Sequence, residues 1–316
     1  MPLANKKSIC TKSTVSIIMN CFNGAEFVNE AIDSILAQTY TKWELIFWDN
    51  QSTDNSANIV SAYNDKRIRY FYAKSFTSLG EARNLAIGKA RGTLIAFLDC
   101  DDLWMTEKLM KQVPLFDNPK IGIVISDTLF FNKSQKEKQL YKKRKPPEGD
   151  VFEELLMRYF ISLETAIVRT AAIKELDELF DIRFSAIEEY DLFIRLCYKW
   201  ELAYVDLILA KWRVHSGSAT WVNSELFGKE RRLFIEKLLR MIPNFNIKYK
   251  THYNALLRKC DYEDAKEVWK TGNLSAARCL LKPHRFTGLS WLVIYFLTFF
   301  PFKMFHLIEK VGRLRP

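Results

Sequence analysis

The chain has 316 residues, of which 48% are hydrophobic, 14% aromatic and 27% charged. These values are ordinary for a globular protein, and they exclude a disordered chain, a collagen and a small disulfide scaffold. Lys and Arg number 47 against 37 Asp and Glu, a formal net charge of +10. Residues 226–316 contain 18 basic and 7 acidic side chains, so the excess lies in the last third. This distribution predicts an anionic partner for the C-terminal region and no nucleic-acid partner.

The cysteines and the N-terminus bear on the compartment. Six cysteines are scattered along the chain without a Cys-x-x-Cys pair, a pattern that predicts free thiols in a reducing environment. Residues 1–13 are polar and contain no apolar signal segment. We therefore expect an N-terminal tail over 1–13 and a cytoplasmic protein.

Short β-rich runs alternate with helical patterns from residue 15 to residue 126. The runs are nearly continuous in apolar residues, which predicts strands covered on both faces, as in a parallel sheet. Between the first two strands, 26–37 is amphipathic and predicts a helix. After the second strand, Ser52-Thr53-Asp54 predicts the start of the next helix. The strands are expected at 15–20, 43–48, 68–72, 93–98 and 121–126.

A basic insert at 133–145, followed by two prolines, predicts a mobile surface loop. Beyond it the pattern predicts helices near 151–160 and 171–179, an apolar run at 164–169, a helix from 187 and a strand over 203–214. Residues 226–280 are rich in Leu, Lys and Arg and predict further helices. The expected architecture is α/β, with a helical C-terminal region over 226–316.

The segment 286–306 is strongly apolar and aromatic. No charged residue occurs from Phe286 to Phe302, and Pro301 interrupts the run. The run is shorter than the ~20 residues that a spanning helix needs. Two interpretations stay open. The segment lies on an anionic membrane surface, helped by basic residues on both sides, or it packs on the protein core or in a dimer interface.

Polar clusters follow three of the expected strands. They begin at Asn20, at Asp49 and at Asp99, and the last places three carboxylates within four residues, 99–102. Ligands bind beyond the carboxyl ends of the strands in open α/β sheets. Carboxylates at this density repel one another unless a cation is bound, and hard oxygen ligands suit Mg²⁺ or Mn²⁺. The alternative is that Asp101 or Asp102 caps a helix that begins near Leu103.

Five segments of the chain, in order, resemble the motifs of family 2 glycosyltransferases, which have the GT-A fold. They are VSIIMNCFNGAEFVNEAIDSIL, WELIFWDNQSTDNS, GEARNLAIGKARGTLIAFLDCDDLW, EEYDLFIRL and WRVHSGSAT, and the resemblance covers about 14–221. It implies a mostly parallel sheet flanked by helices over 14–225, with a donor half near 14–126 and an acceptor half near 127–225. It also implies transfer of a sugar from a nucleotide-sugar, inversion at the anomeric carbon, and a divalent Mn²⁺ or Mg²⁺ ion.

The resemblance assigns the donor side of the site. Asp49 would accept a hydrogen bond from the base, and Arg83 would lie on the nucleotide side. Asp99 would lie by the ribose and, together with Asp101, bind the metal. Two alternatives stay open: Asp49 merely starts a turn, and Arg83 pairs with Glu81 or another carboxylate on its own helix. The wall of the nucleobase pocket would be formed by Cys21, Phe22 and Asn23, with Cys100 between the two metal-side aspartates.

The acceptor side needs a carboxylate that takes the proton of the attacking hydroxyl. Family members usually have Glu-Asp here, with Asp as the base, whereas this chain has Glu189 at that position; Glu188 and Asp191 are the reserve candidates. Alternatively, Asp191 forms only a surface salt bridge with Arg195, four residues on. His215 resembles the family histidine that closes over the diphosphate and contacts the metal.

The most specific prediction is single-sugar transfer, because the Gln-x-x-Arg-Trp motif of processive members is absent from the sequence. A UDP- or dTDP-sugar is the favoured donor, and a glycan or lipid-linked acceptor in cell-surface polysaccharide synthesis is expected at the inner face of the membrane. Transfer to a polyprenyl phosphate and a non-catalytic scaffold with this fold are the alternatives. A dinucleotide-binding dehydrogenase is disfavoured, because no Gly-x-Gly-x-x-Gly follows the first strand.

Overall fold

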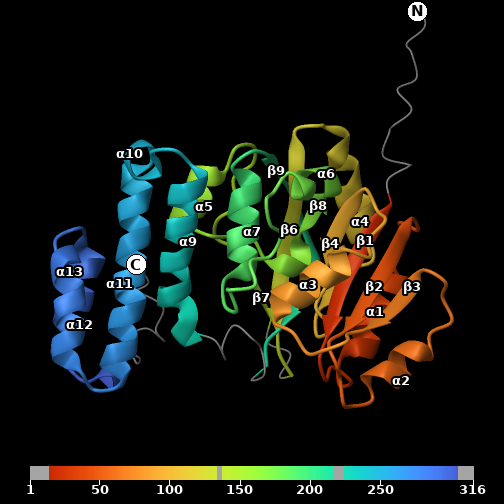
Figure 1. Ribbon diagram of the computed structural model, residues 1–316, viewed down its shortest axis with the longest axis horizontal. Helices are drawn as coiled ribbons and strands as arrows, with labels where there is room; N and C mark the ends of the chain where they lie inside the picture. Colours follow the sequence, from red (N-terminus) through yellow and green to blue (C-terminus); the bar gives the residue numbers. More distant parts are fainter. Residues whose placement is uncertain (1–13, 134–136, 216–223, 305–316) are drawn as a thin grey trace, which may run out of the picture. The chain divides into compact units, whose positions relative to one another are not determined.

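The computed structural model describes residues 14–133, 137–215 and 224–304 (Figure 1). The chain divides into two compact units, Met1–Ser218 and Ala219–Pro316, called unit 1 and unit 2 below. Unit 1 is a single sheet with helices on its faces, and unit 2 is entirely helical in its described part.

The N-terminal half of the sheet is parallel, as predicted. Its strands lie in the order β3-β2-β1-β4, and every residue of β1 and β2 is buried, because helices cover both faces. Helix α2 begins later than predicted, since the Asp54 carboxylate accepts a hydrogen bond from the backbone N–H of Ser56 at 2.9 Å and forms a turn there. The elements are β1 (Val15–Cys21), α1 (Val28–Leu36), β2 (Trp43–Asp49), α2 (Ser56–Ser61), β3 (Ile68–Tyr72), α3 (Leu79–Ile87) and β4 (Leu94–Phe97).

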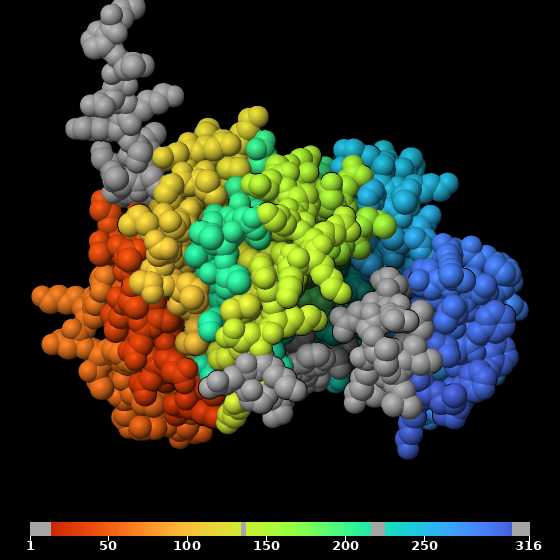
Figure 2. Space-filling model, turned by 180° about the vertical axis from the view of Figure 1, so that it is seen from behind, coloured from red at the N-terminus to blue at the C-terminus, as the bar shows by residue number. Residues whose placement is uncertain are grey.

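The rest of the sheet is mixed, which the strand patterns did not predict. Strand β8 is antiparallel to both β4 and β6, β9 is parallel to β6, and β5 is antiparallel to β9. Figure 2 shows the surface of β9, in green-cyan, beside that of the yellow segment that includes β5. The elements are β5 (Leu103–Trp104), α4 (Lys108–Gln112), β6 (Ile121–Phe131), β7 (Glu137–Gln139), α5 (Phe152–Met157), β8 (Ile167–Arg169), α6 (Thr170–Lys174), α7 (Glu188–Cys197) and β9 (Glu201–Arg213).

Two predictions in this half need correction. The basic insert is not a loop throughout, because β7 pairs with the end of β6 in an antiparallel ladder. Helices α5 and α6 are each shorter than predicted; α6 ends at Lys174. Short 3-10 helices complete the described connections: η2 (Val113–Asp117), η3 (Leu163–Thr165), η4 (Ser224–Leu226) and η5 (Lys282–His284).

Unit 2 confirms the predicted helices over 226–280 and adds one beyond them. Helix α11 packs against α9 and α12, and a small core gathers Tyr262, Trp269 and Leu281 with Ile294 of the last helix. No helix in the described ranges is long and apolar enough to cross a lipid bilayer. The helices are α9 (Phe227–Met241), α10 (Phe245–Lys248), α11 (Lys250–Lys270), α12 (Leu274–Leu281) and α13 (Leu289–Leu297).

A buried polar cluster ties the N-terminal strands together at the edge opposite the acidic clusters. The Ser16 hydroxyl donates to Glu44 at 2.7 Å, and the backbone N–H of Gly92 donates to the Ser16 hydroxyl at 2.8 Å. Arg69 completes the cluster with an ion pair to Glu44 at 2.6 Å. The close approach at Gly92 leaves no room for a side chain, since a Cβ there would lie 2.6 Å from the carbonyl oxygen of Thr14 and 2.7 Å from the backbone nitrogen of Ser16.

We predict that Gly92→Ala lowers the free energy of unfolding by about 2 kcal/mol or more, because backbone atoms must move apart. Gly88→Ala is the control. Gly88 ends helix α3 in a right-handed conformation, so alanine is expected to change stability by less than about 0.5 kcal/mol. Urea unfolding followed by circular dichroism measures both. Equal stability of the two variants would contradict the close approach.

Candidate active site

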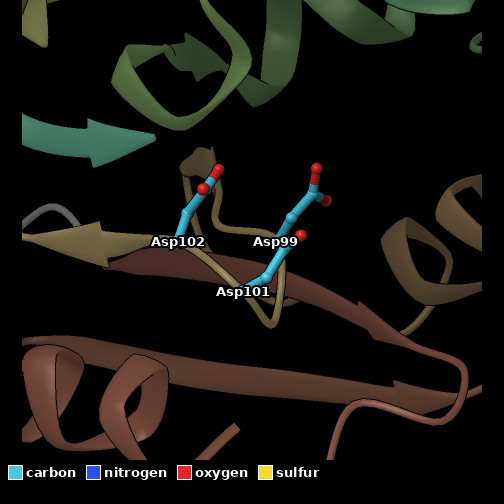
Figure 3. A group of neighbouring side chains, drawn as sticks. All are labelled: Asp99, Asp101 and Asp102. Atoms are coloured by element: carbon cyan, nitrogen blue, oxygen red, sulfur yellow. The ribbon is translucent and has the colours of Figure 1, made fainter. Parts of the chain in front are cut away.

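Three aspartates project from the tight turn that follows β4 (Figure 3). One carboxylate oxygen from each of Asp99, Asp101 and Asp102 lies within 4.8 Å of the others. Asp102 is buried, and it accepts a hydrogen bond from the backbone N–H of Arg213 at 2.8 Å. The turn leads directly into strand β5, so the alternative in which an aspartate caps a helix near Leu103 is wrong.

Electrostatics at this turn favour a bound cation. Burial, followed by the charge of Asp99, raises the pKa of Asp101. Burial and the charge of Asp101 raise the pKa of Asp102 well above its usual range. Carboxylates that repel one another in this way are stabilised by a hard divalent ion, and an all-oxygen donor set fits Mg²⁺ or Mn²⁺. The residues present therefore fit the metal implied by the sequence motifs.

The chain that follows β9 covers the aspartates. His215 approaches Asp101, with 2.8 Å between Nε2 and Oδ2, and its ring lies 5.3 Å from that of Phe27. Arg213 donates from Nε to the carbonyl oxygen of Asp101 at 2.7 Å and forms an ion pair with Glu30 at 2.8 Å. The sequence analysis missed Arg213, although it stands two residues before the predicted histidine.

Hydrogen bonds join the loop that follows β1 to the loop that follows β2. The Asn23 side-chain oxygen accepts hydrogen bonds from the backbone N–H groups of Thr53 at 2.8 Å and Asp54 at 3.3 Å, and Asn23 itself has a positive φ of 55°. Phe22 is half exposed and packs edge-on against the exposed Phe76, with ring centroids 4.8 Å apart. The pair presents an aromatic surface beside the loop, which a planar base can stack against.

Asp49 is fully buried at the end of β2. Its Oδ2 accepts a hydrogen bond from the Tyr70 hydroxyl, and its Oδ1 accepts one from the backbone N–H of Ser52, both at 2.7 Å. The alternative in which Asp49 starts a turn thus describes what the structure contains. A base can reach Oδ2 only if the Tyr70 hydroxyl moves aside. Nothing in the sequence pattern singled out Tyr70.

Cys21 and Cys100 flank Gly24. A Cβ built on Gly24 would lie 2.8 Å from each sulfur, so the two sulfurs are less than twice that distance apart. A hydrogen bond from the Cys100 thiol is the largest influence that lowers the pKa of Cys21, to about 7. The two thiols lie next to the aspartate turn, where side chains larger than Gly24 would not fit.

Arg83 connects the aspartate turn to helix α7. Its guanidinium is buried, and it donates from one amino group to Glu188 at 2.9 Å and from the other to Asp99 at 3.1 Å. The alternative of an ion pair with Glu81 or another carboxylate on the same helix is therefore wrong, because both partners, Asp99 and Glu188, lie outside α3. These partners are 16 and 105 residues away in the sequence.

The three acidic residues at the start of α7 have different environments. Asp191 is fully buried and accepts two hydrogen bonds from Arg195, at 3.0 and 2.7 Å, so the expected salt bridge exists but in the interior. Glu188 is held by Arg83. Glu189 is half-buried, and no described side chain forms a hydrogen bond or ion pair with its carboxylate. Burial first, then the charge of Glu188, raises the pKa of Glu189 to about 8.

Tyr159 adds a polar group near these carboxylates that the sequence analysis missed. Its hydroxyl is buried without a hydrogen-bond partner in the described chain, and its ring lies 5.0 Å from that of Tyr190. Burial and the charge of Glu189 raise the pKa of Tyr159. A buried unpaired hydroxyl is unfavourable by itself, and a bound ligand could supply its partner.

The model of the family described as Glycosyl transferase family 2 matches residues 16–177. The chain belongs to this family. Two Escherichia coli relatives are named UDP-Glc:alpha-D-GlcNAc-diphosphoundecaprenol beta-1,3-glucosyltransferase. WfaP is 30% identical over 65% of this chain and 79% of its own length. WfgD is 27% identical over 69% of this chain and 83% of its own length. A glycosyltransferase of Rickettsia felis is 30% identical over 69% of this chain, which spans only about a third (36%) of that relative.

Solved structures show that this glycosyltransferase has the GT-A fold. Staphylococcus aureus TarS 1–349 in complex with UDP has a TM-score of 0.60 at 18% identity, covering 84% of this chain and 87% of that one. Mannosyltransferase PcManGT from Pyrobaculum calidifontis, in complex with GDP-Man and Mn²⁺, has a TM-score of 0.60 at 17% identity. The match covers 89% of this chain and 78% of that one. The predicted fold class is confirmed, with the mixed second half of the sheet as its refinement.

We predict that Arg83→Met lowers the free energy of unfolding of the glycosyltransferase by about 3–5 kcal/mol, because two carboxylates lose their buried partner. Arg83→Lys is expected to lose less, since it keeps the charge. Lys111→Met, which removes an exposed pair with Glu107 at 3.6 Å, is the control and should change stability by less than about 0.5 kcal/mol. Denaturant titration measures all three. A loss for Arg83→Met no larger than for Lys111→Met would contradict the bridge.

Proposed function

We propose that this glycosyltransferase moves a single sugar, with inversion, from a UDP- or dTDP-sugar to a lipid-linked or other glycan acceptor in cell-surface polysaccharide synthesis. In this proposal residues 14–225 form the catalytic domain. One observation carries it: Arg83 joins the aspartate turn after β4 to the first turn of α7, where the Glu189 carboxylate has no ion-pair partner among the described residues. In this proposal the bridge would hold a donor-side cation site and an acceptor-side base at a fixed spacing.

The donor side would hold Mn²⁺ or Mg²⁺ through Asp101 and Asp99, with His215 beside them. When bound, the ion would offset the negative charge that builds up on the departing nucleotide diphosphate. Support comes from the oxygen donor set, from the raised pKa of Asp101, and from the Mn²⁺ named in the PcManGT complex. Arg213 and His215 would keep the turn in place from the opposite side.

The nucleotide would lie along the loops after β1 and β2. Phe22 and Phe76 offer a face for the base, and Asp49 offers a carboxylate to a base N–H once Tyr70 moves. Cys21, Asn23 and Cys100 would complete the wall. A uracil-type base is favoured because TarS is solved with UDP and the Escherichia coli relatives are named for UDP-Glc.

Glu189 would accept the proton of the acceptor hydroxyl as its oxygen attacks the anomeric carbon. The proton moves to the Glu189 carboxylate and the sugar–phosphate bond breaks on the opposite face, which inverts the configuration. A carboxylate whose pKa lies near the working pH is a better base than an ordinary one, and burial provides this shift. The extra methylene of Glu, relative to Asp, extends the reach of the carboxylate by about 1 Å.

The acceptor is proposed to be attached to a lipid diphosphate at the inner face of the membrane. The printed names of both Escherichia coli relatives specify a sugar on diphosphoundecaprenol as acceptor. Tyr159, whose hydroxyl near Glu189 has no hydrogen-bond partner in the described part of the chain, would contribute to this side of the site.

We predict that calorimetry detects Mn²⁺-dependent binding of UDP or dTDP by the wild type, and that Asp101→Asn weakens it about tenfold or more, because the ion loses an anionic ligand. Asp117→Asn, at an exposed aspartate of η2, is the matched control and should bind normally. Binding that is absent in folded wild-type protein would favour the scaffold alternative. Binding that ignores both Mn²⁺ and Asp101→Asn would overturn the metal assignment.

We predict that kcat/KM falls about tenfold per pH unit as pH decreases below about 8 in Mn²⁺-loaded enzyme. The sign follows from the base: below its pKa, Glu189 already carries a proton and cannot accept another. The charged groups that act on Glu189 are Glu188, Arg83, Asp99 and Glu164.

Glu189→Gln should lower kcat at least about a hundredfold and remove this pH dependence, whereas Glu107→Gln, at an exposed position, should do neither. Full activity of Glu189→Gln on a hydroxyl acceptor would refute the assignment. Activity of Glu189→Gln on a polyprenyl phosphate, which is ionised without a base, would favour that alternative acceptor.

A further inference from the structure

Helix α13 and the residues on either side of it expose a group of large apolar side chains. We call this group the aromatic surface. Its members are 47–78% exposed and all come from the last 19 described residues of unit 2. They are Phe286, Leu289, Phe296, Phe299, Phe300 and Met304.

The same helix is firmly attached to unit 2 by its other face. Ile294 is fully buried against α11 and α12, and Trp291 packs edge-on against Tyr262 with centroids 6.0 Å apart. The Trp269 indole donates to the carbonyl oxygen of Phe300 at 2.8 Å, and Arg278 donates to that of Thr298 at 3.1 Å. The sequence left packing and membrane contact as alternatives, and the first is confirmed for one face of the helix.

The opposite face of α13 is apolar as well. Leu289 and Phe296 are seven residues apart, a spacing that places them on one side of α13, and Phe300 follows just after the helix ends at Leu297. Ile294, which is fully buried, lies on the other side of the helix. An amphipathic surface helix turns polar residues outward, and a contiguous exposed apolar surface marks an interaction site.

The segment that carries the aromatic surface has only basic charges of its own, although Asp261 of the neighbouring helix α11 pairs with His284 at 2.7 Å. From Thr271 to Met304 the sequence contains no Asp or Glu and four basic residues, Arg278, Lys282, Arg285 and Lys303. Two arginines lie over rings of the surface itself. The Arg285 guanidinium is 4.4 Å from the centroid of Phe286, and that of Arg278 is 4.7 Å from Phe299.

We propose that the aromatic surface docks on an anionic lipid bilayer, with its rings at the boundary between headgroups and acyl chains and its basic residues on lipid phosphates. This arrangement lies in the interface without crossing it. It deepens the proposed function, since it brings the enzyme to the bilayer in which a lipid-linked acceptor would reside. It does not depend on the identity of donor or acceptor.

Charge complementarity favours a bilayer over a second copy of the chain. In a two-fold dimer the same patch faces itself, so the four basic residues of one copy would meet those of the other. The segment 271–304 supplies no carboxylate to pair with them. Like charges brought together at an interface oppose association, whereas anionic lipid phosphates neutralise them.

The test is vesicle flotation of the full chain. We expect binding to phosphatidylcholine vesicles that contain about one-third phosphatidylglycerol, and weak binding to phosphatidylcholine alone.

The double variant Phe296→Ser/Phe300→Ser should lower the partition coefficient about tenfold or more. Ile247→Ser on α10 removes another large exposed apolar residue of the same unit and should leave binding unchanged. The double variant Lys282→Gln/Lys303→Gln should lower binding to anionic vesicles about tenfold and weaken its salt dependence.

Nucleotide binding by calorimetry separates this inference from the proposed function, because both double variants should bind the nucleotide normally and keep the wild-type melting temperature. Wild-type protein that binds no vesicles, or binds neutral and anionic vesicles equally, would overturn the proposal. So would a wild-type dimer, seen by light scattering, that Phe296→Ser/Phe300→Ser converts to monomer without any effect on vesicle binding.

Discussion

The buried guanidinium of Arg83 is the contact on which the rest of the site depends. It lies between the carboxylates of Asp99 and Glu188, and so fixes the end of β4 against the start of α7. Arg83 and Glu188 are buried whereas Asp99 is partly exposed, and the buried charges cost several kcal/mol in lost hydration, which the mutual attraction of the three groups must offset. The bridge is therefore weak evidence for stability and stronger evidence for geometry. On the proposed function, it would set the spacing between the donor-side carboxylates and Glu189 that transfer between two substrates requires.

The aspartate turn poses the opposite problem, because it gathers like charges. Asp101 and Asp102 both have raised pKa values, and burial is the main cause in each. Asp102 is partly compensated by the backbone N–H of Arg213, and Asp101 by His215. A cation and the diphosphate that accompanies it would complete this compensation. Binding of the donor should accordingly stabilise the fold as well as fill the site.

The sequence predicted the structural features that short local patterns encode, and it missed those that depend on contacts between residues far apart in the chain. Short, nearly continuous apolar runs such as 43–48 favour buried strands, and the run at 93–98 places the carboxylates of 99–102 at a strand end, so the parallel half-sheet and the acidic turn were predictable. The partners of Arg83 were not, because Glu188 is 105 residues away. Tyr70 on Asp49 depends on the register of β3 beside β2. Strand β7 arises where a polar stretch happens to meet the edge of β6.

The hydroxyl of Tyr70 donates to Asp49 the hydrogen bond that a nucleobase would donate in the proposed function. In the free enzyme it keeps a buried carboxylate paired, so the anion is never left without a donor. On the proposed function, the N–H of an incoming base would replace the Tyr70 hydroxyl as the hydrogen-bond donor to Asp49. Because one hydrogen bond is lost for the one that is gained, the exchange adds little to affinity. A base without a donor at that edge would still have to displace the hydroxyl, and would leave Oδ2 of Asp49 without a donor while Oδ1 keeps the Ser52 N–H. On the proposed function, a contact of small net strength would thus become a large difference in affinity between right and wrong nucleobases.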